Sequence, residues 1–179
     1  MPNLLVMRPA DAVETAECWA IALAQGERPS LLALTRQNLP PLRHDVTENL
    51  CLKGGYRLRN AAATRKVVLV ATGSEVSLAL EVADKLEAAG QGADVVSMVS
   101  TELFDEQDAA YQADILPDDA LIVSIEAGTT FGWERYTGRH GLRFGIDSFG
   151  ASAPIEDLFK HFGLTADAIT PKILARLGA

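Results

Sequence analysis

Cysteine is scarce in this chain, and long uncharged apolar stretches are absent. The two cysteines, Cys18 and Cys51, have no CxxC spacing and follow no signal peptide, which predicts reduced, buried thiols in a cytoplasmic protein. No apolar run reaches the roughly 18 residues of a membrane-spanning helix, so we expect no membrane segment. Basic residues are outnumbered, with 16 Lys and Arg against 24 Asp and Glu and a formal charge of -8. Without a basic run, this balance argues against a nucleic-acid partner.

The familiar motifs of catalysis and cofactor binding are absent as well. The chain contains neither GxGxxG nor GxxxxGK(S/T) for nucleotides, and neither GxSxG nor HExxH for hydrolysis. Its histidines, His44, His140 and His161, have no Cys, His or Glu at the spacing of metal ligands. The residues alone therefore assign no catalytic residue, no cofactor-binding residue and no metal ligand to this chain.

Hydrophobic residues make up 48% of the 179 residues, enough for one globular domain and part of another. Two short apolar runs, residues 4–7 and 31–34, flank a helix predicted over residues 12–25, with Asp11 as its N-cap. The apolar positions of this helix recur at helical spacing: Val13, Ala16, Ala20 and Leu23. The chain thus opens with a βαβ unit that contains a parallel strand pair.

From residue 66 onward, strands and helices alternate regularly. Apolar runs predict strands over residues 67–71, 94–99, 120–125 and 143–147. Amphipathic segments predict helices over residues 76–89, 104–115, 155–162 and 169–177. This alternation is typical of a doubly wound α/β fold with a mainly parallel sheet. Residues 49–65 lack clear periodicity, which predicts a linker between an N-terminal part, residues 1–48, and a domain over residues 66–179.

Several local motifs allow more than one interpretation. The turn at residues 72–75, Thr-Gly-Ser-Glu, could bind a phosphate at a helix start, but its own glutamate repels anions, so a tight turn is favoured. The acidic groups at residues 105–108 and 118–119 are typical of solvated helix starts and turns. Residues 126–138 concentrate aromatic rings and glycines, which fits either an interface or a cap on the core. Residues 145–154 are rich in small side chains, which predicts a close packing contact.

Arg36 is the strongest chemical candidate. The apolar run at residues 31–34 leads into Thr35, Arg36 and Gln37, and open α/β sheets bind ligands at the carboxyl ends of their strands. A guanidinium at such a place can bind a phosphate or carboxylate through two parallel hydrogen bonds. From the residues alone, a structural ion pair with Asp or Glu is the commoner role of an arginine at a strand end.

Longer strings in the chain are more specific. They include Arg-Pro-Ala-Asp at residues 8–11, Thr-Arg-Gln-Asn-Leu at residues 35–39 and Phe-Gly-Ala-Ser-Ala-Pro at residues 149–154. Further strings stand at residues 71–76, 104–108, 126–128 and 147–148, followed by Phe159, Phe162 and Gly163. In this order, and over essentially the whole chain, they resemble the C-terminal part of transketolases. The resemblance implies that residues 1–48 are a βαβ remnant of a pyrimidine-binding domain and residues 66–179 a transketolase C-terminal domain.

The resemblance also implies a function. A transketolase moves a two-carbon ketol group from a ketose phosphate, such as xylulose 5-phosphate, to an aldose phosphate, such as ribose 5-phosphate, in the pentose phosphate pathway or the Calvin cycle. It is a homodimer that uses thiamine diphosphate with Mg²⁺ or Ca²⁺. The family's arginine that grips the sugar phosphate corresponds to Arg36, although many members have Ser where this chain has Thr35.

The departures from the family are all of one kind. The Gly-Asp-Gly motif for metal and diphosphate, the glutamate that activates thiamine, and the histidines of the substrate channel lie upstream in the family and are missing here. Because thiamine catalysis needs that carboxylate and that metal, we expect the polypeptide alone to be inactive. Met1 directly precedes a predicted strand, which suggests a fragment or a split subunit. The alternatives are a non-catalytic assembly or dimerisation module, the C-terminal subunit of a split enzyme and, less favoured, a nucleotide-binding regulator using residues 72–75.

Overall fold

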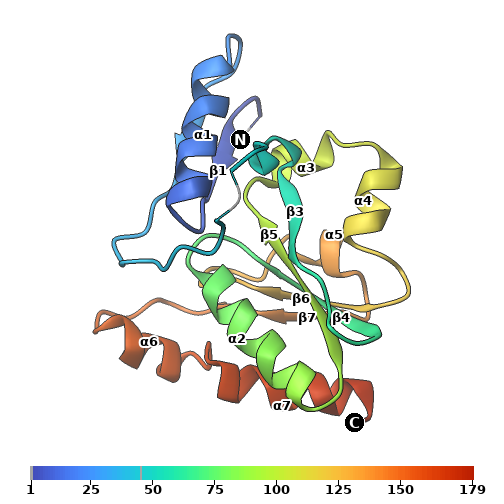
Figure 1. Ribbon diagram of the computed structural model, residues 1–179. Coiled ribbons are helices and arrows are strands. Elements are labelled where there is room, and N and C mark those ends of the chain that lie inside the picture. Colours follow the sequence, from blue (N-terminus) through green and yellow to red (C-terminus); the bar gives the residue numbers. More distant parts are fainter. Residues whose placement is uncertain (1, 45) are drawn as a thin grey trace.

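The computed structural model of the protein describes residues 2–44 and 46–179, and it contains two sheets (Figure 1). A two-stranded sheet belongs to the N-terminal part of the chain, and a five-stranded sheet forms the centre of the remainder. Helices pack against both faces of the larger sheet. This arrangement confirms the predicted α/β class with a doubly wound, mainly parallel sheet.

The N-terminal unit has the predicted βαβ order, with its two strands parallel. Its elements are β1 (Leu5–Met7), α1 (Ala12–Ala24) and β2 (Ser30–Leu32). Asp11 caps α1 as predicted, because its carboxylate accepts a hydrogen bond from the Glu14 amide at 2.8 Å. β2 begins and ends slightly earlier than the apolar run at residues 31–34. Its pairing with β1 ends at Leu32, and the last hydrogen bond between the two segments runs from the Ala33 amide to the Met7 carbonyl at 2.9 Å.

The buried face of α1 differs from the predicted one. Its buried side chains are Glu14, Cys18 and Ile21, whose spacing also places them on one face of a helix. On the predicted apolar face, Leu23 is 80% exposed, and the neighbouring Trp19 is 53% exposed. The prediction followed hydrophobicity alone, whereas the packing places a carboxyl group on the buried side and leaves apolar groups outside.

The five-stranded sheet has the order β3-β5-β4-β6-β7. β3 runs antiparallel to β5, and the other neighbours are parallel. The strands are β3 (Gly55–Arg59), β4 (Arg65–Ala71), β5 (Gly92–Met98), β6 (Leu121–Ile125) and β7 (Leu142–Phe144). Residues 67–71 of β4 are an uninterrupted apolar run, and β6 is apolar except for Ser124, which suits this position because central parallel strands are buried on both faces.

Residues 49–65, predicted to be a linker, contain regular structure. The 3₁₀-helix η1 (Leu50–Lys53) precedes β3, and β3 forms an edge of the larger sheet. The sequence pattern missed β3 because only Tyr56 and Leu58 supply large apolar side chains, and these alternate with arginines. Such charged alternation is typical of an edge strand. The position of the domain boundary itself stays a prediction.

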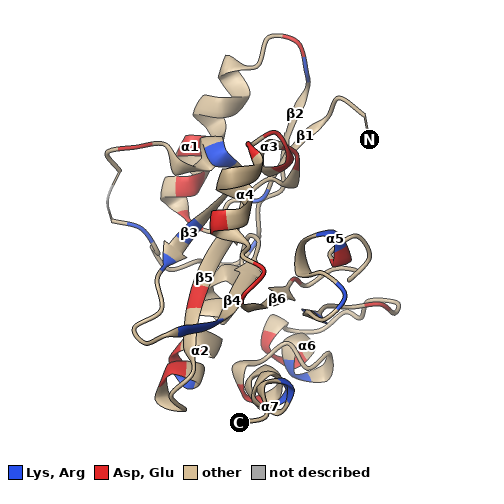
Figure 2. Cartoon of the chain, turned by 90° about the vertical axis from the view of Figure 1, so that its right-hand side faces the viewer, with Lys and Arg blue, Asp and Glu red and all other residues tan. Residues whose placement is uncertain are grey.

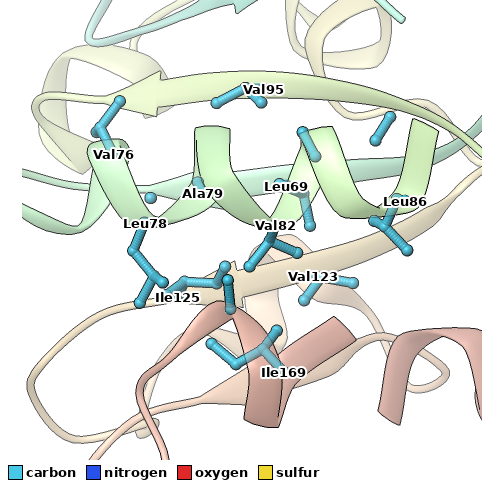
Figure 3. Close-up of a cluster of buried hydrophobic side chains, with 14 of the residues drawn as sticks. Leu69, Val76, Leu78, Ala79, Val82, Leu86, Val95, Val123, Ile125 and Ile169 are labelled. Atoms are coloured by element: carbon cyan, nitrogen blue, oxygen red, sulfur yellow. The ribbon is translucent and has the colours of Figure 1, made fainter. Parts of the chain in front are cut away.

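Helices enclose two apolar clusters on the opposite faces of this sheet. α2 (Glu75–Ala88) and α7 (Ala166–Leu177) cover one face, while α3 (Thr101–Asp105), α4 (Ala109–Ile115) and α5 (Glu134–Thr137) cover the other, and α6 (Ile155–His161) precedes α7. Figure 3 shows Val82 of α2, Val123 of β6 and Ile169 of α7 in the first cluster. Full burial of each such side chain stabilises the fold by about 1.5–3 kcal/mol.

Two helices stand where the sequence predicted a single one over residues 104–115. The break follows from a second cap, because the Asp108 carboxylate accepts a hydrogen bond from the Tyr111 amide at 2.8 Å and so starts α4 anew. Among residues 2–44 and 46–179, no helix is both long and apolar enough to cross a membrane.

Candidate functional site

Arg36 lies in an exposed loop after β2, four residues beyond the end of the strand. Within the described residues, its guanidinium makes no hydrogen bond and no ion pair, so the structural ion pair that is commoner at such positions is not formed. Gln37 donates its amide to the Thr35 hydroxyl at 3.1 Å, which bends the chain at this point. The side chain is therefore free to take an anionic ligand.

The far end of this loop is held by the residue that caps α1. One oxygen of the Asp11 carboxylate accepts the Glu14 amide of the helix, and the other accepts the amides of Leu42 and Arg43 at 2.9 and 3.0 Å. Asp11 is 4% exposed, so these bonds are shielded from water. A single buried carboxylate thus fixes the start of α1 and the end of the Arg36 loop relative to each other.

Replacing Asp11 with Ala is expected to lower the free energy of unfolding by about 1–2 kcal/mol, because the helix cap and the loop anchor are lost together. Asp11→Asn restores the cap but presents an amide N–H₂ to the loop amides, so we expect an intermediate value. Urea denaturation of the three proteins checks this order. Equal stability of the Asp11→Ala protein and the unsubstituted chain would contradict this role.

A buried carboxyl group joins the N-terminal unit to the larger sheet. One oxygen of Glu14 accepts hydrogen bonds from the Tyr56 hydroxyl of β3 and the Ser97 hydroxyl of β5, both at 2.6 Å. Its other oxygen accepts the Ala10 amide at 2.6 Å. Burial raises the pKa of Glu14 even though these three hydrogen bonds act in the opposite direction. The carboxyl group is thus a costly but fully bonded link between the two parts of the chain.

The two cysteines meet beside this carboxyl group. Cys18 of α1 and Cys51 of η1 are both buried and free, which confirms the predicted state of the thiols, and both belong to the apolar cluster around Leu5 and Tyr56. The interaction with the Cys18 thiol and burial raise the pKa of the Cys51 thiol. The sequence does not predict this proximity, because nothing in the spacing of the two cysteines shows that η1 packs on α1.

A cleft of about 550 Å³ lies at the carboxyl ends of β4, β5 and β6. In an open α/β sheet this is the usual position of a ligand. Here the guanidinium of Arg8, from the N-terminal unit, forms an ion pair with Glu126, and the Trp133 ring nitrogen donates to the same carboxylate at 2.5 Å. The sheet's ligand position is thus partly filled by the protein's own arginine.

The structure shows the surroundings of the aromatic stretch at residues 126–138 and of the turn at residues 72–75. Trp133 is 7% exposed and packs in the core, which confirms the core-capping interpretation for this residue. Phe131 is 84% exposed, and an interface role for it stays a prediction. In the turn at residues 72–75, the Ser74 hydroxyl donates to the buried Glu75 carboxylate at 2.8 Å instead of capping α2, and burial raises the pKa of Glu75. These contacts favour a structural turn over a phosphate site.

The acidic groups are more engaged than the sequence predicted. Asp105 forms an ion pair with Arg135 at 2.9 Å, and Asp119 forms one with Arg65 at 2.7 Å. The three histidines are exposed and stand in separate parts of the fold. Among the residues that the structure describes, no group of three His, Cys, Asp or Glu side chains could hold a metal ion.

The first two residues after β7, Gly145 and Ile146, form a close packing contact. A side chain added at Gly145 would place its Cβ 2.6 Å from the Gly128 carbonyl oxygen, which no other residue type tolerates. The Ile146 amide donates to the same carbonyl, so this segment lies directly on the segment after β6. The remainder of the predicted segment does not pack in this way. Residues 147–154 are exposed, and a Cβ added at Gly150 would meet nothing within 4 Å, so the prediction of a packing contact over residues 145–154 is wrong beyond Ile146.

Comparison with known proteins gives matches along nearly the whole chain. The family described as "Transketolase-like TK C-terminal domain" matches residues 54–165, and the family described as "Transketolase, pyrimidine binding domain" matches residues 1–41. A transketolase of Sinorhizobium medicae is 48% identical over 178 residues, which cover 98% of this chain and 26% of that protein. The chain thus spans about a quarter of the length of the curated relatives it matches.

Solved structures resemble the fold closely. A transketolase of Pichia stipitis in complex with sedoheptulose-7-phosphate superposes with a TM-score of 0.89 at 38% identity, over 99% of this chain and 25% of that one. A structure described as a split gene transketolase, inactive beta4 tetramer, has a TM-score of 0.82 at 24% identity, over 99% of this chain and 59% of that one. At that identity the second structure shows a shared fold.

Proposed function

This chain belongs to the transketolase family, and from that premise we propose that it is the C-terminal part of an enzyme that transfers a two-carbon ketol group. The donor would be a ketose phosphate such as xylulose 5-phosphate, and the acceptor an aldose phosphate such as ribose 5-phosphate. The observation that carries the proposal is Arg36, an exposed and unpaired guanidinium in a loop that Asp11 anchors. It sits in the string Thr-Arg-Gln-Asn-Leu, one of the specific strings that resemble the family.

Arg36 would bind the substrate's phosphate group. A guanidinium offers two parallel N–H donors to two phosphate oxygens, and such charge-assisted bonds are about twice as strong as neutral ones. Thr35 and Gln37 shape the turn that presents Arg36, and Asp11 limits how far the loop can move. Orientation of the sugar through its phosphate would place the reacting carbon at a fixed distance from the active centre.

The cofactors are proposed for the complete enzyme. Thiamine diphosphate, when bound, supplies the electron sink for cleavage of the carbon–carbon bond. We propose that it is held with Mg²⁺ or Ca²⁺ by residues outside this chain, because the family's Gly-Asp-Gly motif for metal and diphosphate lies upstream of the part that this chain resembles. The role of this chain is then to bind substrate phosphate and to support the fold and a homodimer, and it would be inactive alone. We also propose that the complete enzyme is cytoplasmic and acts in the pentose phosphate pathway or the Calvin cycle.

We propose the same division of the chain as the sequence suggested, with one change. Residues 1–48 would belong to the pyrimidine-binding domain, because β1 and β2 form a sheet of their own. Residues 66–179 would be the C-terminal domain, and β3 within residues 49–65 would belong with it because β3 pairs with β5. The remaining residues of that segment connect the two parts.

A second candidate is a subunit that assembles with a separately encoded N-terminal chain. One observation favours it: the N-terminal unit exposes large apolar side chains on α1, β2 and the following loop, namely Trp19, Leu23, Leu31 and Leu34. Several large apolar side chains exposed on one small unit are typical of a surface that another polypeptide covers. In the fragment interpretation the same surface would be covered by the upstream part of the same chain.

The experiment joins this chain to the upstream three quarters of the Sinorhizobium medicae transketolase, once as a fusion and once as two separate polypeptides. We expect ketol transfer by the fusion with thiamine diphosphate and Mg²⁺, and none by either part alone. Activity of the separate polypeptides on mixing would support the split-subunit candidate. A folded but inactive fusion, beside an active intact relative, would contradict both.

A further inference from the structure

A second cavity of the described structure is lined by neither Arg36 nor Arg8, and it borders the Arg8 cleft at Asp105, Arg135 and Tyr136. It has a volume of about 680 Å³, within the usual range of small-ligand sites, and it is bounded by α4, α5, the first residues of β6 and the last turn of α7. Its inner wall is apolar, with Leu116, Ile122 and the half-buried ring of Tyr136. Its rim carries Arg139, His140 and Arg176, all exposed.

The arginines of this chain are distributed unevenly with respect to carboxylates. Seven of the eleven form ion pairs with Asp or Glu: Arg8, Arg28, Arg43, Arg57, Arg59, Arg65 and Arg135. Within residues 2–44 and 46–179, the four others have no carboxylate partner. One is Arg36, and the other three, Arg139, Arg143 and Arg176, stand at or directly behind this cavity.

Arg143 connects to the cavity through its wall. Its guanidinium donates to the Thr137 hydroxyl at 3.0 Å and to the Gly138 carbonyl at 3.3 Å, and both residues line the cavity. Figure 2 shows basic segments at α5, in the coil that follows it and on α7. The chain as a whole has a formal charge of -8. The arginines at this cavity, which have no carboxylate partner among the described residues, therefore make its surroundings more basic than the rest of the chain.

The acidic residues of the cavity do not cancel this charge. Asp105 is engaged by Arg135 at 2.9 Å and by the Tyr136 hydroxyl at 3.1 Å. Asp118 is the other acidic residue of the lining, and the lining also contains Arg139 and Arg176, so the basic side chains without a carboxylate partner outnumber it. A helix C-terminus accounts for the position of Arg176 at the end of α7, but it does not account for Arg139.

We propose that this cavity binds a small organic phosphate, with the phosphate group on Arg139 and Arg176 and an apolar ring or chain against Tyr136 and Ile122. The guanidinium groups supply the charge-assisted donors that a phosphate needs, and the apolar wall adds affinity that inorganic phosphate lacks. The site is separate from the proposed substrate site, so it does not depend on the role of Arg36.

Phenyl phosphate tests the site in the 179-residue chain, with His140 as the local reporter. The chain has three histidines, so the Cε1–H resonance of His140 can be assigned in an NMR spectrum with the His140→Gln protein. We expect a saturable shift of this resonance with a Kd at or below about 1 mM. Inorganic phosphate and benzyl alcohol, which each carry half of the proposed recognition, should bind at least about tenfold more weakly.

The variants separate this site from general charge effects. Arg139→Gln and Arg176→Gln together should weaken phenyl phosphate binding at least about tenfold, whereas Lys160→Gln, which removes an exposed charge from α6, should leave it unchanged. An unmoved His140 resonance at about 10 mM phenyl phosphate would overturn the proposal. So would equal weakening by Lys160→Gln, or equal binding of inorganic phosphate.

Discussion

Replacement of Glu14 with Ala is expected to lower the free energy of unfolding by about 3 kcal/mol, which is the largest stability effect that the structure predicts. The change leaves the Tyr56 hydroxyl, the Ser97 hydroxyl and the Ala10 amide without their shared acceptor in a buried place. Each orphaned polar group costs about 1–3 kcal/mol, and loss of the buried carboxyl's own cost offsets part of the sum. Urea denaturation measures the difference. Glu81→Ala, at an exposed position of α2, is the matched control and should change stability by less than about 0.5 kcal/mol.

The same residue predicts how stability depends on pH. Burial raises the pKa of Glu14 above its ordinary value of 4.5, so the folded protein keeps a proton that the unfolded chain has already released. The contribution of Glu14 to stability is therefore full below pH 4.5 and is lost as the pH rises through the raised pKa. Glu14→Gln can accept from Ala10 and donate to the two hydroxyls without titrating. We expect the free energy of unfolding of the unsubstituted chain to fall relative to that of the Glu14→Gln protein as the pH rises from 4.5 through the raised pKa. A constant difference between the two proteins over this range would contradict the raised pKa of Glu14.

This junction also bears on the candidate site. Glu14 fixes α1 to the larger sheet, and Asp11 at the start of α1 fixes the loop that carries Arg36. The two buried carboxyl groups of Asp11 and Glu14 thus fix the position of the loop relative to the larger sheet. A variant that loosens the junction is expected to weaken substrate binding even though Glu14 is remote from the guanidinium.

Much of the fold could be predicted because its strands are long apolar runs. β4 and β6 lie in the inner part of the sheet, and their high content of Val, Leu and Ile indicates buried strands from the sequence alone. The cap at Asp11 could also be predicted, since an aspartate directly before a helical pattern is a local signal. β3 could not, because an edge strand with alternating arginines has the composition of a loop.

The contacts that position the site depend on residues far apart in the sequence. Glu14 is 42 residues from Tyr56 and 83 from Ser97, and no local pattern reports such pairings. A weak signal did exist, since Glu14 shares its helical spacing with Cys18 and Ile21. Hydrophobicity pointed instead to the face with Leu23, which this chain leaves exposed. The candidate site residue, Arg36, was predicted from its string of neighbours. Its exposure, and the absence of an ion-pair partner among the described residues, are visible only in the fold.

The second large effect concerns Arg36 in the fusion with the upstream part of the relative. Loss of a charge-assisted phosphate contact costs about 1.5–3 kcal/mol, so Arg36→Ala should raise KM for xylulose 5-phosphate about 10- to 100-fold. kcat should change much less, because the contact is present in the ground state as well as in the transition state. Arg36→Lys keeps the charge but loses the bidentate geometry, and we expect an intermediate KM.

The most direct test is the ratio of kcat/KM for xylulose 5-phosphate to kcat/KM for xylulose, measured in the fusion with Arg36 and with Arg36→Ala. If this chain brings the phosphate contact to the active site, the substitution lowers the ratio about 10- to 100-fold, and the value for the unphosphorylated sugar stays nearly unchanged. An equal loss with both sugars, which leaves the ratio constant, would contradict the account.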